Sequence, residues 1–198
     1  MTLDQGLAFL LFSTVAAVTP GPSNTMLTAT GAAVGLWRGL PCLLGVSAGM
    51  AALIFCTAIG LGQLVLGHPQ LLRALNWAGA AFLLWLAWKI ASAGRSGEAQ
   101  TPRAVGFVPA AALQWVNPKS WVVGASAAGT YLQADAGGAT LQAIAFAALF
   151  VAAALPSGLL WLALGASMHR LLRSASQARI FNIAMGAALA ASVAMILA

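Results

Sequence analysis

The chain has 198 residues, of which 61% are apolar and only 6% are Asp, Glu, Lys or Arg. A soluble globular domain carries about 25% charged residues, so this chain could not cover its own surface in water. The net charge of +6 would suggest a nucleic-acid partner for a soluble protein, but the nine basic residues form no dense patch in the sequence. The composition therefore predicts an all-α integral membrane protein that binds no nucleic acid.

Six apolar runs are long enough to cross a bilayer core of about 30 Å, which takes about 20 helical residues. They cover about 7–34, 40–66, 72–93, 106–131, 139–168 and 180–198. The residues before the first run carry Asp4 and no Lys or Arg, so we interpret that run as a retained helix and not as a signal peptide. The sequence predicts a single integral membrane domain over 1–198. A cytoplasmic linker at about 94–105 joins a unit at about 1–93 to one at about 106–198.

Basic residues gather on one side of this layout. Seven of them fall in or beside the connections between the first and second, third and fourth, and fifth and sixth runs: Arg38, Lys89, Arg95, Arg103, Arg170, Arg173 and Arg179. The opposite side has only Arg73. Because cytoplasmic loops carry an excess of Lys and Arg, these three connections are predicted to be cytoplasmic, and both termini to lie outside.

Aromatic residues and glycines are placed as in helices that pack within lipid. Most tryptophans fall within a turn or two of the end of a run, where their rings sit at the level of the headgroups: Trp37, Trp77, Trp85, Trp88 and Trp161. Trp115 and Trp121 instead flank an interruption of the fourth run, where we expect packing, with ligand contact as the alternative. Glycines at four-residue spacing predict close helix packing, within the fold or in a dimer: Gly31, Gly35, Gly39, Gly45 and Gly49.

Two of the runs are interrupted by proline at corresponding positions. The first run contains Thr-Pro-Gly-Pro-Ser-Asn at 19–24, and the fourth contains Val-Asn-Pro-Lys-Ser at 116–120. Each interruption lies roughly 18 Å from the ends of its run at 1.5 Å per residue, near the bilayer midplane. Proline removes a helix hydrogen bond, and freed backbone is tolerated in hydrocarbon only beside protein or a water-filled cavity. The breaks therefore predict free amides that suit a carboxylate and free carbonyls that suit an ammonium or a cation.

Lys119 is the one ionisable residue that the layout places deep inside a run. A lysine at the midplane costs roughly 2.5 to 3.5 kcal/mol on insertion scales, and no Asp or Glu falls within a run to pair with it. Its amine could bind a substrate carboxylate, be held by backbone carbonyls, or be neutral. The predicted substrate site comprises the residues of the two breaks and a neighbouring glutamine: Thr19, Pro20, Gly21, Pro22, Ser23, Asn24, Gln114, Asn117, Pro118, Lys119 and Ser120.

The two interruptions also indicate an internal symmetry. Each falls in the first helix of a three-helix unit, and an odd number of crossings inverts the second unit in the membrane. This predicts six transmembrane helices as two inverted three-helix repeats, with the first helix of each repeat broken by proline. Many secondary transporters follow this plan, with substrate bound between the repeats and moved by alternating access. The low charge of the runs favours a small neutral solute.

With these motifs the chain resembles the LysE/RhtB-type family of bacterial amino-acid exporters, named for lysine export and for resistance to homoserine and threonine. The resemblance covers nearly the whole length and rests on Thr-Pro-Gly-Pro at 19–22, the glycines at 31–49, Gly-Ala-Ala-Phe-Leu at 79–83 and Asn-Pro-Lys at 117–119. Phe82 stands where a tyrosine is expected, which leaves the substrate open. The resemblance implies export of amino acids or related metabolites across the plasma (inner) membrane, coupled to a proton or ion gradient, often by a homodimer.

Two other functions are weighed against export of amino acids. A metal or other cation could be exported on the same scaffold, but cation sites usually recruit Asp, Glu or His, which these runs lack. A membrane-embedded enzyme needs an arrayed nucleophile and base or a metal cluster, whereas His68 and His169 fall near opposite faces. The sequence therefore predicts no catalytic residue, no metal and no cofactor. The expected partners are the lipid bilayer and a small-molecule substrate, an amino acid.

Overall fold

The computed structural model describes residues 2–92, 105–131, 138–171 and 174–197, and within these ranges the regular structure is helical throughout. The predicted linker runs over about 94–105, and its residues 94–104 lie outside the described residues. The elements in chain order are α1 (Leu3–Val18), α2 (Pro22–Val34), α3 (Leu36–Cys56), a π-helical segment η1 (Thr57–Leu61), α4 (Gly62–Leu66), α5 (Pro69–Ser92), α6 (Phe107–Val116), α7 (Pro118–Tyr131), α8 (Ala139–Leu171) and α9 (Ala175–Leu197).

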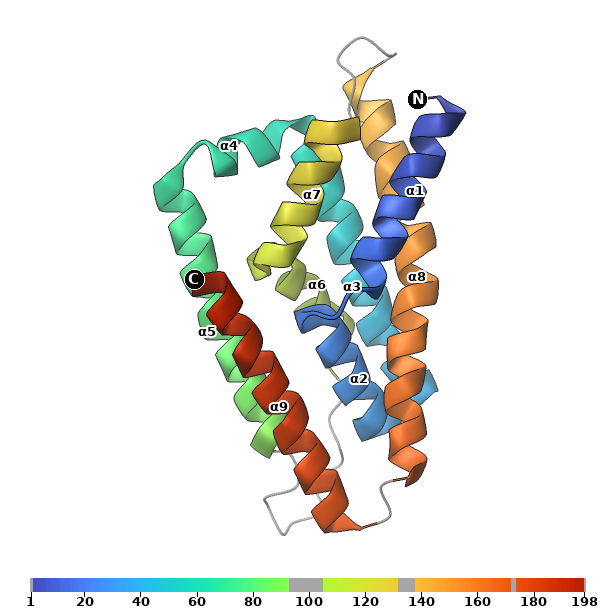
Figure 1. Cartoon of the computed structure of the whole chain (residues 1–198), viewed down its shortest axis with the longest axis vertical. Coiled ribbons are helices and arrows are strands. Elements are labelled where there is room, and N and C mark those ends of the chain that lie inside the picture. The colour runs from blue at the N-terminus through green and yellow to red at the C-terminus, as the bar shows by residue number, and fades with distance from the viewer. Residues whose placement is uncertain (1, 93–104, 132–137, 172–173, 198) are drawn as a thin grey trace.

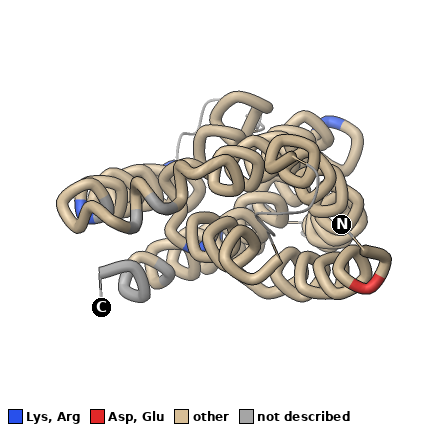
Figure 2. The backbone as a smooth tube through the Cα atoms, turned by 90° about the horizontal axis from the view of Figure 1, so that it is seen from above, with Lys and Arg blue, Asp and Glu red and all other residues tan. Residues whose placement is uncertain are grey.

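Several of these helices have the length and hydropathy of membrane spans. Within the described ranges, Leu36–Leu61, Pro69–Ser92 and Ala139–Met168 meet both conditions. The pair α1 and α2 adds a fourth if it counts as one span, with a bend of 57° at the first predicted interruption. The segments α6–α7 and α9 occupy the remaining two predicted runs. Figure 2 shows how few charged residues the tube carries along these helices. The chain is an all-α membrane protein.

The helices alternate in direction along the long axis of the molecule (Figure 1). The pair α1–α2 descends in that view, α3 returns, α4 crosses the top and α5 descends; α6–α7 then ascends, α8 descends and α9 ascends. Helix α8 packs along α2 and α3, and α3 also packs along α6. Helices α5 and α9 pack along each other as a slanted pair beside this central group.

Glycines set the closest approaches between these helices. A Cβ at Gly31 of α2 would lie 2.2 Å from the carbonyl oxygen of Leu162 in α8, and one at Gly45 of α3 would lie 2.2 Å from that of Phe107 in α6. Gly39 lies against the Leu162 side chain, and Gly49 against the backbone of Ala111. These helices therefore meet backbone to backbone, which glycine permits because it has no Cβ.

Gly35 departs from the predicted packing role. A Cβ at this position would have no neighbour within 4 Å, and the φ of +79° is a conformation that L side chains rarely adopt. Gly35 forms the turn at which α2 ends and α3 begins. The predicted stripe of glycines at 31, 35 and 39 thus belongs to two helices and not to one. The second run also begins earlier than predicted, at Leu36 instead of Leu40.

The second predicted run also ends differently from the expectation. The sequence predicts one span as far as about Leu66, but Gly60 has a φ of +115° within η1, so the chain bends there. Helix α4 then crosses the top of the molecule in Figure 1 before α5 descends. Gly60 is one of many glycines in apolar sequence, and most of these sit in ordinary helix, so the sequence alone does not indicate which would bend the chain.

Candidate functional site

The two proline interruptions, far apart in the sequence, lie next to each other in the structure. Lys119 Nζ donates to the carbonyl oxygen of Thr19 at 2.5 Å and to that of Pro20 at 3.5 Å. Ser23 Oγ donates to Gln114 Oε1 at 3.0 Å, and Asn117 Nδ2 donates to Ser23 Oγ at 3.4 Å. Four hydrogen bonds therefore join the α1–α2 break to the α6–α7 break.

At the first break, side chains replace the hydrogen bonds that α1 loses where it ends. Asn24 Nδ2 donates to the carbonyl oxygens of Ala17 and Thr19, at 2.9 Å each. Trp161 Nε1, from α8, donates to the Val18 carbonyl oxygen at 3.3 Å. With Lys119 on Thr19, the carbonyls of 17, 18 and 19 all have donors, as backbone that faces hydrocarbon requires. The Lys119 amine also lies at the negative end of the α1 dipole, which favours a cation.

At the second break, asparagine and tryptophan hold the chain between the two half-helices. Asn117 is extended, with φ −90° and ψ 112°, and its Oδ1 accepts from the backbone N–H of Lys119 at 3.1 Å. Trp121 Nε1 donates to the Trp115 carbonyl oxygen at 2.7 Å, and the two rings pack edge to face with centroids 6.4 Å apart. Neither tryptophan lines the cavity described next. Their role is the packing that was expected for them.

A cavity of about 50 Å³ lies where the two breaks face α3 and α8. Its polar wall comes from the breaks: Gly21, Ser23, Asn24, Gln114, Asn117, Lys119 and Ser120. Its apolar wall comes from the neighbouring helices: Ala16, Ala17, Leu27, Val46, Met50, Val123, Phe150, Ala154 and Gly158. One water takes about 30 Å³ of liquid volume, and small-molecule sites usually measure about 300 Å³ or more. As it stands, the cavity is therefore smaller than a site that holds a small molecule.

The polar wall is tied together across the two breaks. Gln114 is 1% exposed, and its Oε1 accepts from both Ser23 Oγ and Ser120 Oγ, each at 3.0 Å. Its Nε2 donates to the carbonyl oxygen of Ala110 at 3.1 Å. Gln114 thus uses both ends of its amide, which fixes the orientation of the side chain.

Seven of the eleven residues predicted for the substrate site line this cavity. The other four act through the backbone. Thr19 and Pro20 offer the carbonyls that Lys119 binds. Pro22 and Pro118 begin α2 and α7, where a missing N–H removes no helix hydrogen bond. Among the three states open to the Lys119 amine, the structure has it held by backbone carbonyls.

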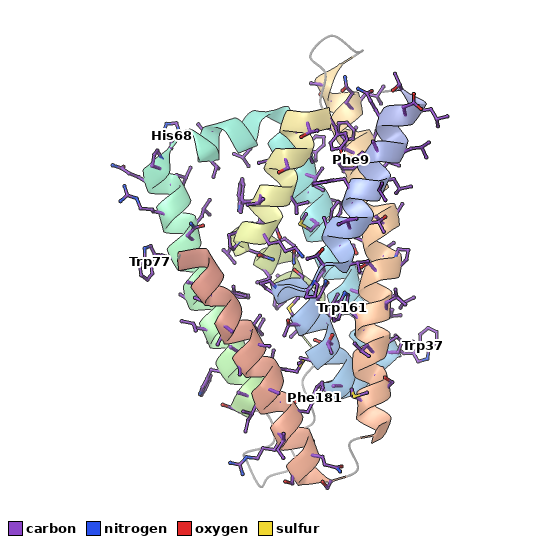
Figure 3. All side chains as sticks on the ribbon, viewed as in Figure 1. Phe9, Trp37, His68, Trp77, Trp161 and Phe181 are labelled. Carbon is purple, nitrogen blue, oxygen red and sulfur yellow. The ribbon has the colours of Figure 1, made fainter. Side chains whose placement is uncertain are left out.

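Two parts of the site were missed at the sequence level. The apolar wall from α3 and α8 could not be told from other core residues, because Met50 and Phe150 lie in uniformly apolar runs. Trp161 was predicted at headgroup level, and its contact with the first break was not predicted. The indole is half-buried and bonded to the end of α1, beside the break in Figure 3. Trp37 and Trp77, by contrast, point outward from the molecule.

A bundle of apolar helices with a small cavity, walled partly by polar side chains, at two broken helices has the architecture of a membrane transporter. Within the described residues, no three His, Cys, Asp or Glu side chains are grouped to hold a metal. Residues 14–198 match the family model described as LysE type translocator, and the chain belongs to that family. The resemblance seen in the sequence is thereby confirmed.

Curated relatives include the cysteine/O-acetylserine efflux proteins of enteric bacteria. The protein of Salmonella typhimurium (strain LT2) is 35% identical over 126 residues, which is 63% of this chain and 64% of the relative. That of Escherichia coli (strain K12) is 32% identical over 126 residues, with the same coverage of both chains. The matched region thus spans just under two thirds of the length of these relatives. No solved structure matches the chain.

Proposed function

We propose that this chain is a secondary transporter that exports small neutral amino acids across the bacterial plasma membrane by alternating access. The observation that carries the proposal is the joining of two broken helices at one cavity with a polar wall, where Lys119 binds the carbonyls of Thr19 and Pro20. Two relatives are named for the efflux of cysteine and O-acetylserine, which are small neutral amino acids. The residues predicted for the substrate site are proposed to bind this substrate.

The chemistry of the cavity suits a zwitterion. The carbonyls at the end of α1 accept hydrogen bonds from a cation and favour an ammonium group. Helix α2 begins at the cavity with no side chain capping its first amides, and those amides together with the Lys119 amine favour a carboxylate. Met50, Val123 and Phe150 provide an apolar wall for a short side chain.

The arrangement of the helices supports two inverted repeats, one from α1 to α5 and one from α6 to α9. The broken pairs α1–α2 and α6–α7 run in opposite senses in Figure 1. Corresponding helices pack on each other, α3 on α8 and α5 on α9. The second helix of each repeat also packs on the broken helix of the other repeat: α3 packs on α6, and α8 packs on α2. In alternating access one repeat rocks against the other, and the bonds between the breaks part and re-form.

Charge supports an orientation for this carrier. Arg38 near the start of α3, Lys89 in the last turn of α5 and Arg179 in the first turns of α9 belong to the lower end of Figure 1. That end is proposed to be cytoplasmic because cytoplasmic ends carry the excess of Lys and Arg. The N-terminus then lies outside. A proton or ion gradient is proposed to drive export.

Counterflow in liposomes tests the proposal. Purified protein is reconstituted, the liposomes are loaded with an unlabelled amino acid, and uptake of the labelled amino acid is followed under reducing conditions for a panel that includes cysteine and O-acetylserine. We expect at least one small neutral amino acid to accumulate. The Gln114→Leu variant should slow its uptake by about tenfold or more, because Ser23 and Ser120 then lose their shared acceptor.

The matched control for that assay is Gln70→Leu, the same change at an exposed residue in the first turn of α5. It should leave uptake unchanged. Failure of the wild-type protein to accumulate any member of the panel would refute the proposed function. Equal rates for the two variants would instead refute the location of the substrate site.

A further inference from the structure

The Lys119 amine occupies the place that an ammonium ligand would take. It lies on the carbonyl oxygens of Thr19 and Pro20, at the negative end of the α1 dipole, and its side chain lines the cavity. A second feature makes room for it there. A Cβ at Gly21 would lie 3.1 Å from Lys119 Cδ and 3.3 Å from Nζ, so the missing side chain of Gly21 lets the lysine reach these carbonyls.

We propose that Lys119 is an internal substitute for the ammonium group of the substrate. This inference rests on the proposed function as an amino-acid carrier. In the empty carrier the lysine amine binds the carbonyls at the end of α1; in the loaded carrier the substrate's ammonium group replaces it there. The displaced lysine amine then pairs with the carboxylate of the same substrate molecule across the cavity.

The proposal follows from what closure does to the carbonyls of the break. Thr19 and Pro20 are exposed on the helix bundle, so closure of the carrier against the bilayer core would leave a carbonyl that lacks a donor facing hydrocarbon, which is unfavourable. Lys119 supplies the donor for Pro20 and a second donor for Thr19, which Asn24 also binds. The empty carrier can therefore close and return across the membrane without a substrate in the site.

This role separates two transport modes that share one site. Net export requires the empty carrier to return, and so it depends on the lysine amine. Exchange of one substrate molecule for another uses the loaded carrier in both directions, where the substrate's own ammonium binds the carbonyls. Loss of the lysine amine should therefore slow net export far more than exchange, because exchange loses only the pairing of this amine with the substrate carboxylate. A lysine that served only to hold the fold, or only to bind the substrate carboxylate, would affect both modes alike.

The Lys119→Met variant tests this separation in liposomes with the full chain. For a substrate that the wild-type protein carries, we expect the ratio of net efflux to counterflow to fall by about tenfold or more, the effect of leaving the Thr19 and Pro20 carbonyls without the lysine amine.

Two controls accompany this variant. Lys89→Met makes the same change at a lysine whose Nζ lies 4.4 Å from the centre of the Trp85 ring and which does not line the cavity, and it should leave both modes unchanged. In a Cys42→Ala and Cys56→Ala background, Lys119→Cys alkylated with 2-bromoethylamine regains an amine of almost lysine length. It should regain net efflux, whereas alkylation with iodoacetamide, which adds no amine, should not.

Each outcome tests either the substitute role of Lys119 or the proposed transport function. If Lys119→Met loses counterflow and net efflux together, or keeps both, the substitute role is overturned while the proposed function stands. If aminoethylation fails to restore net efflux to a variant that still exchanges substrate, the role is overturned as well. Absence of counterflow in the wild-type protein overturns the proposed function, and the substitute role with it.

Discussion

Four side chains bind the carbonyls near the end of α1. Thr19 Oγ1 donates to Val15 at 2.6 Å, Asn24 to Ala17 and Thr19, Trp161 to Val18, and Lys119 to Thr19 and Pro20. The sequence predicted freed carbonyls and named Asn24 and Lys119 beside them. It could not predict Trp161, because that donor comes from α8 and its position depends on how α8 packs against α1.

Replacing Trp161 tests this account at a single residue. Trp161→Phe removes the N–H that Val18 accepts and leaves that carbonyl without the indole, so unfolding in detergent should become easier by about 1–2 kcal/mol. The control Trp77→Phe changes a ring that is 64% exposed, and it should have no comparable effect. Circular dichroism during thermal or denaturant unfolding gives both values. Equal stability of the two variants would contradict a capping role for Trp161.

Proline by itself does not decide where a helix breaks in this chain. Pro41 lies inside α3 and Pro156 inside α8, and both helices continue through them. The breaks occur where proline has particular neighbours. Gly21 stands between two prolines, and Asn117 precedes Pro118 with a side-chain oxygen that binds the next turn. Both breaks could be predicted from the sequence because each proline has these neighbours and because the two prolines lie at corresponding positions in the two halves of the chain.

Close contact between α2 and α8 depends on reciprocal glycines. Gly31 of α2 lies on the backbone of Leu162, and a Cβ at Gly165 of α8 would lie 2.0 Å from the carbonyl oxygen of Thr28. Neither helix can move aside without disturbing the adjacent break, since α2 begins at it. The four-residue spacing predicted close packing at Gly31, but the partner of each glycine depends on the three-dimensional arrangement.

A glycine-to-alanine pair tests this helix contact. Gly165→Ala forces α2 and α8 apart and should lower the free energy of unfolding by about 1–3 kcal/mol or more. Gly129→Ala is the matched control in α7, because a Cβ there has nothing within 4 Å. It should raise helix stability by up to about 1 kcal/mol. Unfolding curves in the same detergent compare the two, and a Gly165→Ala variant as stable as Gly129→Ala would contradict the contact.

At the scale of the whole molecule, periodic and compositional signals predicted most of the helices and the position of the cavity. The apolar runs correspond in order to the helices of the described ranges, and seven residues of the predicted site meet at one cavity. The bend at Gly60, the turn at Gly35 and the apolar wall from α3 and α8 were not predictable. Each depends on which segments pack together. The sequence does not distinguish a glycine that packs between helices from one that forms a turn, or an apolar residue of the core from one that lines a site.

The central claim is that an amino acid binds between the two breaks, and protection of a cysteine placed there tests it most directly. Ser23→Cys, in a Cys42→Ala and Cys56→Ala background, is alkylated with a small water-soluble maleimide in liposomes, with and without a saturating amino acid that supports counterflow. The control is Ser167→Cys, in the groove beside the turn from α2 to α3. The account predicts slower alkylation at position 23 when the amino acid is present, and no change at position 167. An alkylation rate at position 23 that the amino acid leaves unchanged would contradict the account.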